Sequence, residues 1–217
     1  MVQSTLSSSD TAERLRGTAF VHLSPALYAS YATDDFATAS AFVARVAEAA
    51  DAMNHHPNVR LGYGSVAFEL SSHDAGGVTE RDVELATRIQ SLADDLGVRA
   101  DSRPTARYTI AIDTVDADHI RDFWRVGMGY EERTTEDGIV LVDPRGVAPK
   151  IWFQAMEPPR LDRNRIHLDV YVPTTDARAR VEAVLAAGGT LMTDEYAPEW
   201  WVLADVEGNE LCICTAD

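Results

Sequence analysis

Residues 51–82 read "DAMNHHPNVRLGYGSVAFELSSHDAGGVTERD", and this stretch decides the fold of the first half of the chain. Pro57 cannot continue a helix, so the helix before it ends at or before the histidine doublet. Apolar and polar residues then alternate on both sides of Gly62–Gly64, which predicts two strands joined by a turn. Thr79 and Asp82 have the spacing of a capping box, which predicts a second helix. The order is therefore helix, hairpin, helix.

The flanking segments extend this unit. Thr33 is the predicted N-cap of the first helix, with Asp34 and Asp35 in the first turn, where the helix dipole favours acidic side chains. Gly97 is a natural stop for the second helix, and an earlier strand is predicted near Ala26–Tyr31. Apolar residues recur in the first helix at three- and four-residue steps, giving one stripe that faces a core. These residues are Phe36, Ala39, Val43, Val46, Ala50 and Met53.

The second half follows a polar segment and contains a faint internal repeat. We predict an α+β protein with a first domain at 20–97, a linker at 98–106 and a second domain at 107–216. "LVDPRG" begins at Leu141 and "LADVEG" at Leu203, and each copy follows a predicted strand, helix and strands. Two such copies predict a pseudo-symmetric domain with a concave surface.

Composition excludes several classes of function. The net charge of −16, from 35 acidic and 19 basic residues, disfavours nucleic-acid binding, which depends on neutralising phosphates. No apolar run approaches the roughly 20 residues of a membrane helix. The start "MVQSTLSSSD" lacks the features of a secretory signal. Cys212 and Cys214 are the only cysteines, which is typical of a reduced, cytoplasmic protein.

Three of the six histidines, His55, His56 and His73, fall between residues 53 and 77. Asp51 precedes His55 by one helical turn and is predicted to orient its ring, while the hairpin returns His73 towards the helix end. Imidazole is the side chain best suited to remove and donate protons near neutral pH, so three of them together indicate acid–base chemistry. Two alternatives stay open: the doublet only caps a helix C-terminus, or it binds a metal. The spacing fits no common zinc pattern.

The whole pattern resembles the signature of pterin-4a-carbinolamine dehydratases, over residues of about 28 to 96. The signature positions are Asp51, His55, His56, Pro57, Tyr63, His73 and Asp82. This family removes water from a 4a-hydroxytetrahydropterin to give quinonoid dihydropterin, with no metal or organic cofactor. The resemblance implies that the three histidines are catalytic or bind substrate, and that the other four positions orient groups or bind substrate. Asp82 is equally explained as a capping residue.

The resemblance thus predicts a cytoplasmic hydro-lyase that takes a pterin substrate and supports tetrahydropterin recycling. Because the family forms dimers or tetramers, it also implies a homo-oligomer. The chain departs from the family pattern in three places. Residues 1–25 lack a tryptophan, Ser72 replaces the commoner threonine, and Asn54 stands where an acidic residue is frequent.

Residues from about 105 to 216 resemble a glyoxalase-like domain of the vicinal oxygen chelate superfamily, which implies paired βαβββ modules. The segments that carry the resemblance are "DADHIRDFWRVGMGY", "LVDPRGVAPKIWFQAM", "NRIHLDVYV" and "LADVEGNELCIC". Metal enzymes of this superfamily draw His, Gln or Glu ligands from four strands. The corresponding positions here are Thr109, Gln154, His167 and Cys212.

Thr109 and Cys212 do not suit a hard metal, so we predict no metal. His167 is either a pocket wall or a core residue. Trp152, Trp200 and Trp201 either line a small-molecule cavity or pack between the repeats. The alternatives to the dehydratase prediction are a metal-dependent lyase or dioxygenase in this half, or a module that binds a small molecule without turnover.

Overall fold

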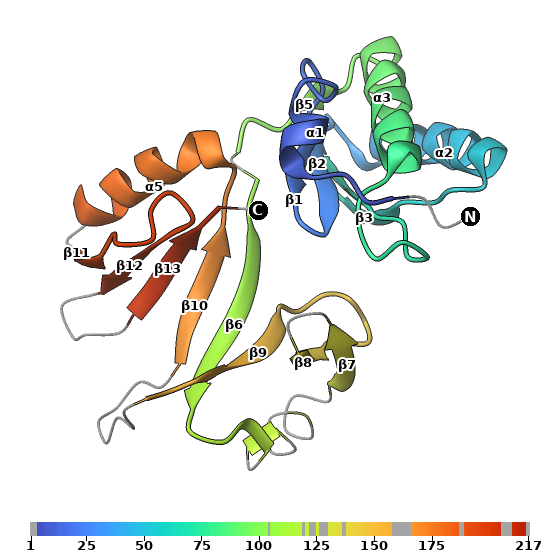
Figure 1. Cartoon of the computed structure of the whole chain (residues 1–217). Helices are drawn as coiled ribbons and strands as arrows, with labels where there is room; N and C mark the ends of the chain where they lie inside the picture. Colours follow the sequence, from blue (N-terminus) through green and yellow to red (C-terminus); the bar gives the residue numbers. More distant parts are fainter. Residues whose placement is uncertain are drawn as a thin grey trace. The chain divides into compact units, whose positions relative to one another are not determined.

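The computed structural model describes residues 4–103, 105–118, 120–121, 125, 130–135, 138–157, 166–186, 189–204 and 210–215. The chain divides between Thr105 and Ala106 into two compact units (Figure 1). Each unit combines helix and sheet, so the predicted α+β class is confirmed. None of the helices within the described residues is long and apolar enough to cross a membrane.

The first unit has the predicted helix, hairpin and helix at its centre. Its elements are α1 (Ser8–Ala12), β1 (Val21–Leu23), β2 (Ala26–Ala32), α2 (Phe36–Met53), β3 (Asn58–Gly62), β4 (Ser65–Leu70), α3 (Glu80–Asp95) and β5 (Arg99–Ala100). The strands form an antiparallel sheet of order β1-β2-β4-β3, and β5 pairs with β2. Residues 99–100, within the predicted linker, are therefore part of this sheet.

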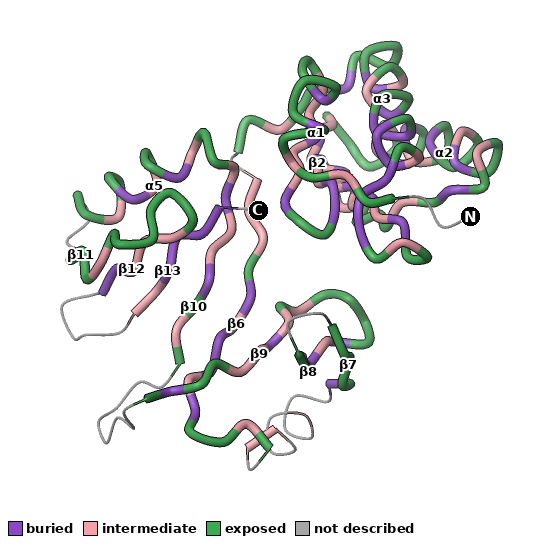
Figure 2. Tube along the Cα trace, in the orientation of Figure 1, coloured by how far each residue is buried: buried purple, intermediate pink, exposed green. Residues whose placement is uncertain are grey.

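Helices α2 and α3 lie together against one face of the sheet (Figure 1). Buried positions recur along both helices and in the strands beneath them (Figure 2). The ring of Phe42 packs edge-on against Tyr31 and Phe68, with centroids 5.3 and 5.4 Å away. Leu15 and Phe20 belong to the same buried cluster. The core thus also draws on residues before position 20, where the first domain was predicted to begin.

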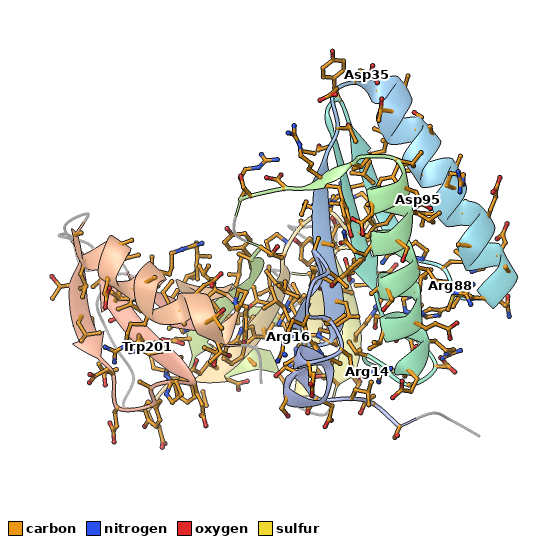
Figure 3. The ribbon with its side chains drawn as sticks, turned by 90° about the horizontal axis from the view of Figure 1, so that it is seen from above. Arg14, Arg16, Asp35, Arg88, Asp95 and Trp201 are labelled. Atoms are coloured by element: carbon orange, nitrogen blue, oxygen red, sulfur yellow. The ribbon has the colours of Figure 1, made fainter. Side chains whose placement is uncertain are left out.

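The ends of α2 determine how the chain enters and leaves it. Asp35, not the predicted Thr33, is the N-cap, and its carboxylate accepts a bond of 2.7 Å from the Thr38 N–H (Figure 3 labels Asp35). The helix begins at Phe36, so Asp35 has the correct offset. At the other end Asn54 is left-handed, with φ 47°. The N–H of His55 then bonds to the Ala50 carbonyl at 3.1 Å, which closes the helix.

The second unit is built on one sheet of order β11-β12-β13-β10-β6-β9-β8-β7. Its elements are β6 (Arg107–Thr114), β7 (Glu131–Thr135), β8 (Gly138–Val142), β9 (Lys150–Ala155), β10 (Ile166–Tyr171), α5 (Thr174–Ala186), β11 (Thr190–Thr193), β12 (Trp200–Ala204) and β13 (Glu210–Cys214). The order is symmetric about the antiparallel β10–β6 pair, as the internal repeat predicts. Most of the predicted helix at 116–127, and most of "LADVEG", lie outside the described residues.

Helix α5 covers one face of this sheet (Figure 1). Val181 on the helix packs with Leu203 and Ile213 on β12 and β13. Side chains alternate between the two faces of a strand, so the residues between these point to the opposite face. That opposite face carries the polar residues described below.

Candidate functional site

The register of the β3–β4 hairpin brings the predicted site residues to one end of the first sheet. Asn58 pairs with Glu69, so residues 55–57 before β3 lie beside residues 71–73 after β4. The first turn of α3 joins them, because the Ser72 hydroxyl donates to Asp82 at 2.8 Å. Three segments that are distant in sequence therefore meet.

A buried pair, His55 and Asp82, is the centre of this arrangement. Nε2 of His55 lies 2.7 Å from Oδ1 of Asp82, and the two residues are 7% and 0% exposed. Oδ2 of Asp82 accepts the Thr79 N–H at 2.7 Å as well as the Ser72 hydroxyl. The predicted capping box of Thr79 and Asp82 is present. Asp82 therefore caps α3 with one oxygen and holds His55 with the other.

Asp51 does not orient His55 as predicted. It lies 2.9 Å from Nε2 of His56 instead, and both of these side chains are exposed. The prediction assumed that helical geometry continues to His55. The helix ends at Met53 and Asn54 is left-handed, so His55 leaves the helical path and reaches Asp82.

His73 is exposed in a turn that is tied to the same network. It follows Ser72, whose carbonyl accepts the N–H groups of Ala75 and Gly76 at 3.0 and 2.9 Å. Arg81 on α3 donates to Asp74 in this turn. The Arg81 guanidinium holds the pKa of the Asp74 carboxyl below its usual value, and the nearby His55 acts in the same direction. The turn is thus fixed to α3 at Ser72 and at Asp74.

The remaining two signature residues, Pro57 and Tyr63, lie at opposite ends of β3. Pro57 is half-buried between the doublet and β3. Tyr63 lies at the hairpin turn and is 81% exposed. β3 is extended, so four steps of about 3.3 Å put the turn about 13 Å from Asn58. Within one chain, Tyr63 therefore lies at the opposite end of β3 from the histidine doublet.

The polar face of the second sheet gathers a different cluster around Asp169. Asp169 lies opposite Thr109 on β6 and Cys212 on β13. Nε2 of His167 is 3.5 Å from Oδ1 of Asp169, and the Trp152 indole N–H donates to Oδ2 at 3.2 Å. Asp113 lies 3.6 Å from Nδ1 of His167. The cluster is a histidine between two carboxylates, beside a thiol.

Two groups in this cluster have shifted pKa values. Asp169 raises the pKa of His167 by hydrogen bonding, more than burial lowers it, and Asp113 and Glu210 add to the increase. Burial and the neighbouring Asp169 raise the pKa of the Cys212 thiol. A proton on His167 is therefore favoured, and the Cys212 thiol is not an activated nucleophile in the protein alone.

The predicted pocket residues of the second unit are only partly brought together. Trp152, His167 and Cys212 meet at Asp169. Gln154 is exposed, beside Asp113 in the register. Trp201 pairs with Ile213 and packs against the cluster under α5, so it belongs to the opposite face (Figure 3 labels it). Trp200 stacks on Tyr196 at 4.4 Å.

Sequence reasoning missed Asp169 and the contact of Ser72 with Asp82. Asp169 lies two residues after His167 on one strand, and this spacing puts both side chains on the same face. This two-residue spacing is the sequence signal that could have identified Asp169. For Ser72 the sequence offers no comparable signal, because its contact depends on how the turn docks on α3.

Comparisons with known proteins divide at the same place as the fold. Residues 5–92 match the family model "Pterin 4 alpha carbinolamine dehydratase", and residues 109–214 match the model "Glyoxalase-like domain". A protein of Koribacter versatilis, named provisionally as a pterin-4-alpha-carbinolamine dehydratase, is 43% identical over 67 residues, which are 31% of this chain and 71% of the relative. A relative from Thermomicrobium roseum with the same name is 46% identical over 68 residues, 31% of this chain and 73% of its own length.

Solved structures match each unit separately. A transcriptional coactivator/pterin dehydratase from Brucella melitensis is 31% identical and matches 42% of this chain and 99% of its own, with a TM-score of 0.40. A glyoxalase/bleomycin resistance protein/dioxygenase superfamily member from Vibrio splendidus 12B01 is 16% identical. The match covers 51% of this chain and 99% of that one, with a TM-score of 0.33.

Proposed function

Since the chain belongs to the pterin-4a-carbinolamine dehydratase family through its first unit, we propose that this unit dehydrates a 4a-hydroxytetrahydropterin to the quinonoid dihydropterin. The observation that carries the proposal is the buried contact of 2.7 Å between His55 and Asp82, joined through Ser72 to the turn that holds His73. This arrangement holds the His55 imidazole in place. It leaves the His73 imidazole exposed, in the turn that Ser72 connects to Asp82.

The reaction needs a base and an acid. The proton on N5 is removed, the C4a–O bond breaks, the C4a=N5 double bond forms, and the hydroxyl leaves as water after taking a proton. His55 is the proposed base, because the carboxylate of Asp82 stabilises the imidazolium that forms when the ring takes a proton. His73 is the proposed acid for the departing hydroxyl, and His56 is proposed to position the pterin. The 4a-hydroxytetrahydropterin would come from aromatic amino-acid hydroxylation, and the dihydropterin product would rejoin the tetrahydropterin pool only after a separate two-electron reduction.

Stopped-flow dehydration of a synthetic 4a-hydroxytetrahydropterin tests this proposal. The wild type should accelerate the reaction, and the double variant His55→Ala, His73→Ala should lose about 10²- to 10⁴-fold of that acceleration, the usual contribution of acid–base groups. His22→Ala is the matched control. His22 lies in the same unit, where its Nδ1 contacts the Thr11 hydroxyl at 2.9 Å, and this variant should retain the rate.

Two outcomes would count against the proposal. If the folded wild type binds the pterin but does not accelerate dehydration, the unit is a binding module. If the double variant keeps the wild-type rate, the histidines are not the acid and base. Equal losses in the double variant and in His22→Ala would indicate a general folding defect, which circular dichroism of the variants detects.

A further inference from the structure

The start of the chain contacts the turn that carries His73, and this contact has no role in the function proposed above. The segment before α1 passes the beginning of α3 (Figure 1), and the Leu6 N–H donates to the Val78 carbonyl at 2.7 Å. Thr5 lies against Gly77 at the end of the turn. We propose that Thr5 is a positioning residue, which holds the turn so that His73 reaches the substrate. This inference rests on the proposed dehydratase function and adds to it a residue outside the signature positions.

The contact between Thr5 and Gly77 is close enough to exclude a side chain at position 77. Gly77 is buried, and a Cβ atom there would lie 3.0 Å from Cγ2 of Thr5 and 3.5 Å from its Cβ. The first distance is shorter than an ordinary van der Waals contact between carbon atoms. The preceding Gly76 has φ 72°, which favours glycine for its backbone conformation. The glycine at position 77 is explained instead by the approach of Thr5.

The turn is closed at its base and is fixed to α3 by two side-chain contacts. The Ser72 N–H donates to the Gly77 carbonyl at 3.0 Å, which closes the base. The Ser72 hydroxyl donates to Asp82 on α3, and Arg81 on α3 donates to Asp74. The start of the chain contacts the turn at its last residue. The turn is therefore held by two parts of the chain that are distant in sequence.

The position of His73 depends on the backbone of this turn. His73 is exposed, so packing around the ring does not fix it. A general acid must lie within hydrogen-bond distance of the oxygen that leaves. A displacement of about 1 Å can lower a rate by about 100-fold. A residue that holds the turn backbone can thus change the rate through His73 without touching the substrate.

The rival explanation is that the start of the chain only stabilises the fold. Leu6 packs against the core of the first unit, and Arg14 donates to Glu80 on α3 at 2.6 Å. Contacts of this kind would stabilise the unit as a whole. The two explanations differ in whether a change at the contact between Thr5 and Gly77 lowers kcat while the protein stays folded.

Moving one methyl group across this contact separates the two explanations. Gly77→Ala places a methyl group against Cγ2 of Thr5, so kcat for dehydration should fall about 10- to 100-fold with little change in KM. Thr5→Ala removes Cγ2 and should lower kcat by less. The double variant Thr5→Ala, Gly77→Ala has its methyl group on the other side of the contact. It should therefore regain most of the wild-type kcat.

Gly62→Ala is the matched control. Gly62 ends β3, at the opposite end of that strand from the histidine doublet, and a Cβ atom there would lie 3.3 Å from the Ser65 hydroxyl oxygen. This variant introduces the same methyl group into the same unit, and it should keep the wild-type kcat. Adding Thr5→Ala to it should have only the effect that Thr5→Ala has alone.

Amide hydrogen exchange of the free protein measures the turn without the reaction. The N–H groups of Ala75 and Gly76 bond to the Ser72 carbonyl at 3.0 and 2.9 Å. Both should exchange faster in Gly77→Ala, because the turn is displaced from the start of the chain. The double variant should restore slow exchange, and Gly62→Ala should leave it unchanged.

Three results in the rate measurements would overturn the inference. They are a wild-type kcat in Gly77→Ala, a double variant no faster than Gly77→Ala, or a loss of kcat that only follows the unfolded fraction seen by circular dichroism. A wild type without dehydration activity would contradict the proposed function instead. Hydrogen exchange would then still show whether Thr5 holds the turn, and unchanged exchange at Ala75 and Gly76 in Gly77→Ala would show that it does not.

Discussion

Asp82 and Asp51 each contact one histidine of the doublet, and burial makes these two contacts very different. The Asp82 side chain is fully buried, and its oxygens satisfy His55, Ser72 and Thr79. The Asp51 and His56 side chains are 79% and 57% exposed, where water competes for the same hydrogen bond. Removing a partner from a buried network leaves polar groups unsatisfied, whereas at the surface water replaces the lost group.

We therefore predict opposite outcomes for two equivalent substitutions. Asp82→Asn should lower the free energy of unfolding by about 1 to 3 kcal/mol, because it weakens both the α3 cap and the contact with His55. Asp51→Asn should change it by less than about 0.5 kcal/mol. Urea unfolding at pH 7, followed by the helical circular dichroism signal, measures both values. Equal effects would mean that the buried network contributes nothing beyond a surface pair.

The family resemblance proposed seven signature positions, but spacing along the chain could not pair the two carboxylates with the histidines of the doublet. Spacing along a helix predicts a partner only while the helix continues. Here the backbone of Asn54 turns left-handed one residue before His55. The same limit applies to Asp169, whose neighbours on β6, β9 and β13 come from other strands and become contacts only through the sheet register.

The C-terminal end of α2 shows how a turn element sets the direction of a site residue. Asn54 has φ 47°, a conformation that costs most side chains about 1 kcal/mol and costs glycine almost nothing. Asn54→Ala should therefore lower the free energy of unfolding by about 1 kcal/mol, while Asn54→Gly should be close to neutral. Urea unfolding of the two variants gives the comparison. If alanine proved as stable as glycine, the left-handed cap would not be what ends α2.

The turn between β8 and β9 explains the first copy of the Leu-x-Asp-x-x-Gly repeat. Oδ1 of the buried Asp143 accepts the Nε–H of Arg145 at 2.8 Å, and Oδ2 accepts the Ala148 N–H at 3.1 Å. Gly146 has φ 68°, which favours glycine at this position. The second copy, from Asp205 to Gly208, lies outside the described residues.

The contacts of Asp143 in this turn lead to a prediction for how the stability of the second unit depends on pH in the acid range. The Arg145 side chain, together with backbone N–H groups, lowers the pKa of Asp143 from 3.8 to about 2. A carboxyl whose pKa is depressed on folding adds stability above its unfolded pKa, and that stability is lost as the pH falls towards its folded pKa. The stability difference between wild type and Asp143→Asn should be constant above a pH of about 5 and shrink between about 4 and 2.

Urea midpoints of the second unit, read from tryptophan fluorescence at several pH values, test this expectation. A difference that grows on acidification would contradict it. Asp118, an exposed carboxylate of the same unit that pairs with Arg121, offers a control, since Asp118→Asn should have little effect at any of these pH values.

Helices and strands with a clear repeat of apolar residues were predictable from the sequence, whereas the short helices and strands were not. Both long helices and the hairpin of the first unit have several repeats of apolar spacing. By contrast, α1, β1 and β5 have five, three and two residues, which is too short for a pattern. They are held by the tertiary packing of the unit, as the place of β5 beside β2 shows. For the same reason the end of the first unit was predicted before residues 99–100.

Each of the two units has its own buried core, which has consequences for the molecule as a whole. The first core centres on Phe42 and its aromatic neighbours, and the second unit has separate clusters around Leu203 and around Leu141. The chain also provides a natural probe that distinguishes the units. All four tryptophans, at positions 124, 152, 200 and 201, lie beyond the division at Thr105.

This arrangement leads to a prediction of two separable unfolding events. Phe42→Ala should lower the stability of the first unit by about 3 to 5 kcal/mol, and Leu203→Ala that of the second by about 2 to 5 kcal/mol, because each leaves a cavity in a closed core. Calorimetry should show two transitions, and each variant should lower only one of them. Tryptophan fluorescence should follow the Leu203→Ala transition and be insensitive to Phe42→Ala. If both substitutions shifted the fluorescence transition equally, the two units would unfold as one cooperative body, and a change at the histidine site could then not be separated from a change at the cluster around Asp169.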